Sequence, residues 1–152
     1  MLNGVLPSHS IPHVITSAIE HPCVLNVCEY LSEMGQCELT IIPVNEEGVV
    51  DVREVLTSVK PTTCLITIMH ANNEVGSIQP ISELSRALKA TLPPGIRPLL
   101  HTDASQSLGK IPVDIDVLGV DFLTLAGHKL YAPKGIGVLY ISPEIEKRLN
   151  GK

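Results

Sequence analysis

The sequence has no long apolar run and no clustered basic stretch. No segment approaches the ~18 apolar residues that a membrane-spanning helix requires, and Met1 to Ser10 has no basic start followed by an apolar run. The net charge is -5 and the lysines and arginines are scattered, so the basic stripe that nucleic-acid backbones select is missing. We therefore expect a soluble protein without a membrane or nucleic-acid partner. We place it in the cytoplasm, or in mitochondria if a targeting segment lies outside this chain.

The four cysteines do not have the spacing of a zinc site. Cys23, Cys28, Cys37 and Cys64 contain no CxxC pair, and they do not form the dense framework of a small secreted domain. We expect free thiols, buried or half-buried, in a reducing compartment. No metal site is expected.

Short apolar segments alternate with helical patterns along the chain. Its 152 residues, 44% of them hydrophobic, suffice for one domain with a sizeable core. Strands are expected at residues 13–19, 37–44, 64–69, 97–103, 121–127 and 135–141, and helices at residues 22–34, 51–59 and 80–92. This alternation predicts an α/β fold of three layers, in which helices cover both faces of a mostly parallel sheet.

Polar clusters follow four of the expected strands. They are EHP after the first strand, HANNEVG after CLITIM, HTDASQS after RPLL and GHK after FLTLA. Ligands in open α/β sheets bind outside the carboxyl ends of the strands. Four such clusters at one sheet edge would form a single site.

Three side chains in these clusters suit pyridoxal chemistry, and each also has a simpler interpretation. A lysine at a strand end, as Lys129 is, can be desolvated, which favours the neutral amine that forms Schiff bases; otherwise it is a surface lysine. Asp103 would need a partner such as the protonated pyridine nitrogen of pyridoxal phosphate, or it caps a helix. His21 could lie flat on an aromatic ring and take protons, or it is a solvated or capping histidine.

Weaker candidates lie in the second and third clusters. Asn72, Asn73 and Glu74 have the composition of a turn, but an asparagine amide at this place could also donate a hydrogen bond to a cofactor phenolate. Gln106 and His70 carry little information on their own.

Four segments, taken in order, carry a family resemblance. TSAIEHPCVL, TIMHANNEVGSIQPI, HTDASQSLGKIPVDI and VDFLTLAGHKLYAPKGIGVLYI closely resemble the cysteine desulfurases and selenocysteine lyases, which are pyridoxal-phosphate enzymes of the class V aminotransferase family. The resemblance covers residues 13 to about 142. It implies that residues 13–152 are part of the pyridoxal-phosphate-binding large domain of fold type I enzymes. Residues 1–12 are expected to be a flexible N-terminal segment.

The resemblance implies roles for six residues that match the family's motifs. Lys129 would form the internal aldimine with pyridoxal 5'-phosphate, His128 would contact the cofactor phosphate, and Asp103 would pair with the pyridinium nitrogen. Gln106 and Asn73 would hydrogen-bond the phenolic oxygen, and His21 would stack over the ring and help to move protons. The implied reaction removes sulfur from cysteine, or selenium from selenocysteine, and leaves alanine.

Two positions depart from the family pattern, and two family segments have no match in this chain. Ala126 stands where a serine usually helps to hold the phosphate, and Ala132 stands where a glycine is usual, so we expect looser cofactor binding. The family also has a preceding phosphate loop and a following domain with the catalytic cysteine and a substrate-binding arginine. We therefore expect little or no activity from this chain alone.

Three functional hypotheses follow. The first is a desulfurase-like enzyme or a selenocysteine lyase that is active at full length, homodimeric like its family, with a sulfur-acceptor protein as a further partner. The second is a truncated, non-catalytic isoform that acts as a binding module, and whose sheet and apolar edge would be exposed. The third is an aminotransferase-like enzyme outside sulfur chemistry.

Overall fold

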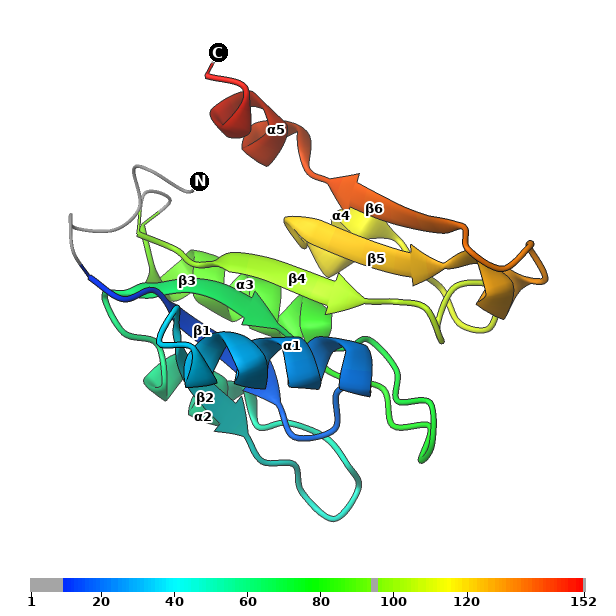
Figure 1. Cartoon of the computed structure of the whole chain (residues 1–152), viewed down its shortest axis with the longest axis horizontal. Coiled ribbons are helices and arrows are strands. Elements are labelled where there is room, and N and C mark those ends of the chain that lie inside the picture. Colours follow the sequence, from blue (N-terminus) through cyan, green and yellow to red (C-terminus); the bar gives the residue numbers. More distant parts are fainter. Residues whose placement is uncertain (1–9, 94–95, 152) are drawn as a thin grey trace.

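A six-stranded sheet forms the centre of the fold (Figure 1). The computed structural model describes residues 10–93 and 96–151, so most of the expected flexible segment, residues 1–12, lies outside the described residues. The strands are β1 (His13–Ser17), β2 (Glu38–Ile42), β3 (Thr63–Thr67), β4 (Leu99–Asp103), β5 (Phe122–Ala126) and β6 (Gly137–Ile141). The helices are α1 (Pro22–Glu33), α2 (Val52–Thr57), α3 (Ile81–Thr91), α4 (Ile115–Leu118) and α5 (Pro143–Leu149), with a short 3-10 helix, η1 (Gly127–Leu130).

The strands lie in the order β2-β1-β3-β4-β5-β6, and every neighbouring pair is parallel except β5 with β6. The mostly parallel sheet predicted from the sequence is therefore confirmed. β6 runs antiparallel to β5 because residues 127–136, which connect the two strands, are fewer than the dozen or so that a parallel crossover needs.

Helices cover both faces of this sheet. Figure 1 shows α1 on one face and α2, α3 and α4 on the other. Ile15, Ile66 and Leu100 of the strands are 0% exposed, and they belong to a core that also holds Leu84 and Leu88 of α3. The expected three layers are therefore present.

Local signals in the sequence explain where the helices begin and end. α1 begins after His21 with Pro22 at its first position, and Gly35, with a φ of +65°, follows its end. α4 was not expected from the sequence. It begins at Asp114, whose carboxylate accepts hydrogen bonds from two backbone N–H groups of the helix, and its 4 residues are too few to show a helical repeat.

The four cysteines are free thiols, without a disulfide in the part of the chain that the structure describes. Cys28, Cys37 and Cys64 are buried with Val14 on the α1 face, as expected. Cys23 is exposed, which corrects the expectation of burial at this position. It lies in the first turn of α1.

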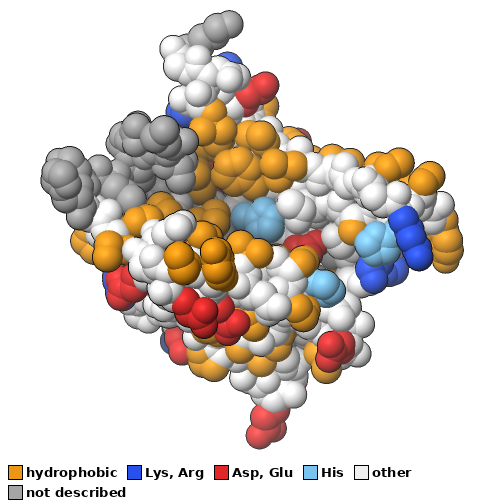
Figure 2. Space-filling view, in the orientation of Figure 1, with side chains coloured by type: hydrophobic (Ala, Val, Ile, Leu, Met, Phe, Trp, Pro, Cys, Tyr) orange, Lys and Arg blue, Asp and Glu red, His pale blue; other side chains and the backbone are white. Residues whose placement is uncertain are grey.

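The α1 face also carries an open apolar groove. Figure 2 shows hydrophobic side chains gathered on this face. Leu65, Leu99 and Phe122 line the groove together with Leu139, which is 56% exposed. Because α1 covers only part of the face, β6 presents apolar side chains to solvent. Within the described ranges, no helix is long and apolar enough to cross a membrane.

Candidate functional site

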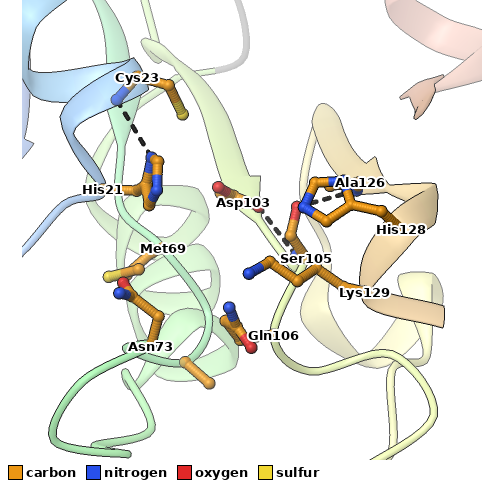
Figure 3. A pocket seen from close by; sticks show the side chains of 11 residues that line it. His21, Cys23, Met69, Asn73, Asp103, Ser105, Gln106, Ala126, His128 and Lys129 are labelled. Carbon is orange, nitrogen blue, oxygen red and sulfur yellow. Dashed lines mark hydrogen bonds between the residues drawn. The ribbon is translucent and has the colours of Figure 1, made fainter. Parts of the chain in front are cut away.

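A cavity of about 270 Å³ lies where β1, β3, β4 and β5 end (Figure 3). All six residues that the sequence predicted for the site line this cavity: His21, Asn73, Asp103, Gln106, His128 and Lys129. Figure 3 shows His21 and Asn73 on one wall, His128 and Lys129 on the opposite wall, and Asp103 between them. The volume is below the ~300–1,000 Å³ of pockets for drug-sized molecules, so the cavity suits a small ligand.

His21 both caps α1 and lines the cavity. Its Nδ1 accepts a hydrogen bond from the backbone N–H of Cys23 at 3.2 Å. Pro22, which lies between them, has no backbone N–H and needs no acceptor. With Nδ1 acting as the acceptor, the neutral ring carries its proton on Nε2. The capping interpretation and the functional one are therefore compatible, because the cap orients the ring and leaves Nε2 for a ligand.

Asp103 is the last residue of β4, and its side chain is half-buried. Its Oδ1 accepts a hydrogen bond from the backbone N–H of Ser105 at 2.8 Å. The hydroxyl of Ser105 in turn accepts a hydrogen bond from the backbone N–H of Ala126 at 2.9 Å, which joins the ends of β4 and β5. Asp103 therefore caps a turn rather than the helix that the simpler interpretation expected, and its carboxylate faces the cavity (Figure 3).

Three amide side chains lie at or beside the cavity, and they differ in the contacts that they make. Gln106 Oε1 accepts a hydrogen bond from Lys110 Nζ at 2.8 Å, which leaves the amide nitrogen to donate into the cavity. Asn72 holds the turn after β3, because its Oδ1 accepts from the backbone N–H groups of residues 74 and 75 at 2.8 and 2.9 Å. Its neighbour Asn73 lines the cavity instead. The turn interpretation thus applies to Asn72, and the binding one to Asn73.

Lys129 and His128 lie in η1, directly after β5, and both side chains are exposed. Gly127 allows this placement: a Cβ there would lie 2.7 Å from the carbonyl oxygen of Ile136, so a larger residue would push η1 away from the chain that leads into β6. Tyr131 ends η1 with a φ of 62°. Backbone geometry therefore aims the lysine toward the cavity.

Several residues around the site were not anticipated. Cys23, Met69, Ala71 and Ser105 also line the cavity. Partial desolvation of the otherwise exposed thiol and the nearby Asp103 carboxylate raise the pKa of Cys23, so at neutral pH it stays protonated.

Glu20 lies in the EHP cluster, and its burial was missed. Burial raises the pKa of its carboxyl to about 7, although hydrogen bonds from Ser17 and from the backbone of Met69 lower this pKa in part. An acidic residue directly after a buried strand was the signal that could have identified it. His70, a weak candidate from the sequence, is buried outside the cavity lining, and burial lowers its pKa. Residues 10–93 and 96–151 contain no group of three or more His, Cys, Asp or Glu placed to hold a metal ion.

Comparison with known proteins finds similar selenocysteine lyases and cysteine desulfurases. Selenocysteine lyase of Rattus norvegicus is 50% identical over an alignment of 139 residues, and this alignment covers 86% of this chain and 31% of the relative. Cysteine desulfurase IscS of Dictyoglomus turgidum is 48% identical over 129 residues, 85% of this chain and 31% of the relative. A solved structure described as SspA in complex with cysteine has a TM-score of 0.78 at 42% identity, over 86% of this chain and 36% of that one.

This chain thus spans about a third of the length of the relatives it matches. The family model described as Aminotransferase class-V matches residues 6–151, which is nearly the whole sequence. The chain belongs to the class V aminotransferase family.

Proposed function

We propose that the cavity binds pyridoxal 5'-phosphate through Lys129, and that the chain is part of an enzyme that removes sulfur from cysteine or selenium from selenocysteine. One observation carries the proposal: an amine, a carboxylate, two imidazoles and two amides, taken from four separate strand ends, line one small cavity. The relatives named cysteine desulfurase and selenocysteine lyase support the choice of substrate.

The donor set fits the cofactor. Bound pyridoxal phosphate supplies an aldehyde that bonds to amines and a protonated pyridine ring that withdraws electrons from the substrate. The Asp103 carboxylate is a suitable partner for the ring nitrogen, and the free amide nitrogen of Gln106, with Asn73, can donate to the ring oxygen. Lys129 supplies the amine, and His128 beside it supplies a donor for the phosphate.

His21 is the residue suited to moving protons. Its ring is fixed by the Cys23 N–H at Nδ1, so Nε2 is the atom that gives or takes a proton at a bound amino acid. Met69 and Ala71 give the same wall an apolar surface, against which a flat ring can pack while water is excluded.

The thiol that would accept sulfur is not assigned to Cys23. Although Cys23 lines the cavity, the raised pKa of its thiol leaves little of the nucleophilic thiolate at neutral pH. The proposal includes a homodimer and a separate sulfur-acceptor protein as partners of the whole enzyme.

Lysine-specific cofactor binding tests the proposal. Pyridoxal phosphate added to the purified chain should produce an absorbance band for the lysine-bound cofactor, and borohydride reduction followed by peptide mass analysis should locate the label on Lys129. Lys129→Ala should lose the band, whereas Lys134→Ala, which changes an exposed lysine in the same loop, should keep it. A band that survives in Lys129→Ala would overturn the assignment.

A further inference from the structure

Glu20 is a buried carboxyl beside the cavity that has no part in the proposed chemistry. It follows β1 and directly precedes His21, and it is 6% exposed. Ser17 Oγ donates to its Oε1 at 2.6 Å, and the backbone N–H of Met69 donates to the same oxygen at 2.8 Å. The backbone pairing of β1 with β3 has ended before this point, so the Glu20 carboxyl continues the connection between the two strands.

A second side chain joins the same two loops. Asn72 Nδ2 donates to the carbonyl oxygen of Ile19 at 2.8 Å, in the same direction as the N–H of Met69, which donates to Glu20. These two bonds hold the loop that carries His21 against the loop that begins at Met69. The geometry of the cavity wall therefore depends on them.

The other oxygen of Glu20 is buried and accepts no hydrogen bond from the residues that the structure describes. The groups that face this carboxyl from the described elements are the Ser17 hydroxyl, the Met69 N–H, the Asp103 carboxylate and the thiols of Cys23 and Cys28, and none of them is a cation. A buried carboxylate with one bare oxygen is costly, which favours the form that carries a proton. Burial and the Asp103 charge act in this direction on the pKa of Glu20.

We propose that Glu20 is a positioning residue of the cavity, which ties the His21 loop to the loop after β3 and whose proton is coupled to the charge of Asp103. The inference rests on the proposed function, in which a protonated ring nitrogen pairs with Asp103. When a cation neutralises Asp103, its repulsion of an ionised Glu20 is removed, so Glu20 releases its proton to solvent more readily. By linkage, cofactor binding and ionisation of Glu20 favour each other.

Urea unfolding of the cofactor-free chain tests the buried carboxyl. Glu20→Gln keeps an oxygen that can accept from Ser17 and Met69, but it cannot ionise. The folded state holds the Glu20 proton more tightly than the unfolded state, so the wild type should lose stability as the pH rises. We therefore expect the ratio of the folding equilibrium constants of wild type and Glu20→Gln to fall by roughly 10- to 100-fold from pH 5 to pH 8. Glu33→Gln, at the exposed end of α1, is the matched control and should show no comparable change.

Asp103→Asn tests the coupling without cofactor. Removing the Asp103 charge should move the pH dependence assigned to Glu20 toward lower pH. If Glu20 has only a structural role, Glu20→Gln should be less stable than the wild type by the same factor at every pH, and Asp103→Asn should not move the pH dependence of stability. Either result overturns the proposal. If Glu20→Gln does not fold, Ser17→Ala serves instead, since loss of the hydroxyl bond should move the profile toward higher pH.

Titration with pyridoxal phosphate at pH 6 and pH 8 completes the test. The Kd of the wild type should decrease with rising pH by a few-fold more than the Kd of Glu20→Gln, and an equal decrease in both proteins contradicts the coupling. If the wild type binds no cofactor at Lys129, the proposed function fails. The unfolding profiles of Glu20→Gln and Asp103→Asn still decide the inference about Glu20, so the two failures are distinguishable.

Discussion

Arg97 and Asp121 form a bidentate ion pair just before β4 and β5 begin. The distances from Nη1 to Oδ2 and from Nη2 to Oδ1 are both 2.9 Å, and the side chains are 10% and 6% exposed. Asp121 Oδ2 also accepts a hydrogen bond from the backbone N–H of Leu100 at 2.8 Å. A planar guanidinium matches a carboxylate through two parallel bonds, so the pair aligns the two strands whose far ends lead to Asp103 and Lys129.

Arg97→Ala should strongly destabilise the fold. It leaves the buried Asp121 carboxylate without its cation, a change that typically costs about 3–5 kcal/mol of unfolding free energy. Urea unfolding measures the loss. Lys60→Ala is the matched control, because the Lys60–Glu38 pair is 43% and 52% exposed and water replaces the lost partner. Equal losses in the two variants would show that Arg97 and Asp121 are not effectively buried.

Ala126→Ser should tighten the binding of pyridoxal phosphate. Ala126 lines the cavity, and its backbone is held by the Ser105 hydroxyl, so a new side-chain hydroxyl could donate to the phosphate. A hydrogen bond to a charged group contributes ~1.5–3 kcal/mol, which is about 10- to 150-fold in Kd. Equilibrium titration measures the change, with Ala90→Ser on exposed α3 surface as the control. An unchanged Kd would mean that the phosphate binds away from residue 126.

Gly127→Ala should displace η1. The added Cβ would meet the Ile136 carbonyl oxygen at 2.7 Å, and relieving this contact should cost about 1–3 kcal/mol of stability. Cofactor binding should weaken too, because Lys129 moves with η1. Ala132→Gly added to Gly127→Ala should not restore either property, since the closer obstruction is backbone. Restoration would show that the 3.3 Å approach to the Ala132 side chain was the true constraint.

Buried and half-buried histidines should make the fold sensitive to acid. Burial lowers the pKa of His13, His70 and His101. The His101 ring lies between the hydroxyls of Thr67 at 2.7 Å and Thr124 at 3.2 Å, and so bridges three strands. Because the folded state binds fewer protons at these rings than the unfolded state, their contribution to stability is complete above about pH 6.5 and is lost as the pH falls below it.

His101→Gln isolates one of these contributions. Urea unfolding gives the ratio of the folding equilibrium constants of wild type and His101→Gln. This ratio should be constant above pH 7 and should decrease toward pH 5. Glu20 acts in the opposite sense, since its raised pKa favours the folded state at low pH, so the comparison is made with the wild type at each pH. A ratio that does not change with pH would mean that the ring titrates alike in both states.

The location of the site could be predicted because it depends on a local pattern and one rule of topology, and the family resemblance then selected the six residues within it. Apolar runs bounded by glycine and proline locate the strands, and parallel pairing brings their carboxyl ends to one edge. His21, Asn73 and Lys129 follow three such strands, Asp103 ends a fourth, and the four side chains line one cavity. Their roles in binding and catalysis stay predictions.

The sequence by itself determined the α/β class, the positions of the six strands and of helices α1, α2 and α3, and six of the residues that line the cavity. Only the tertiary structure decided where the pairing of each strand stops, the exposure of Cys23 and the burial of Glu20. The Glu20 carboxyl bonds to the backbone of Met69, 49 positions away. No local pattern encodes such a bond, because hydrogen-bond partners and desolvation arise only when distant segments pack together.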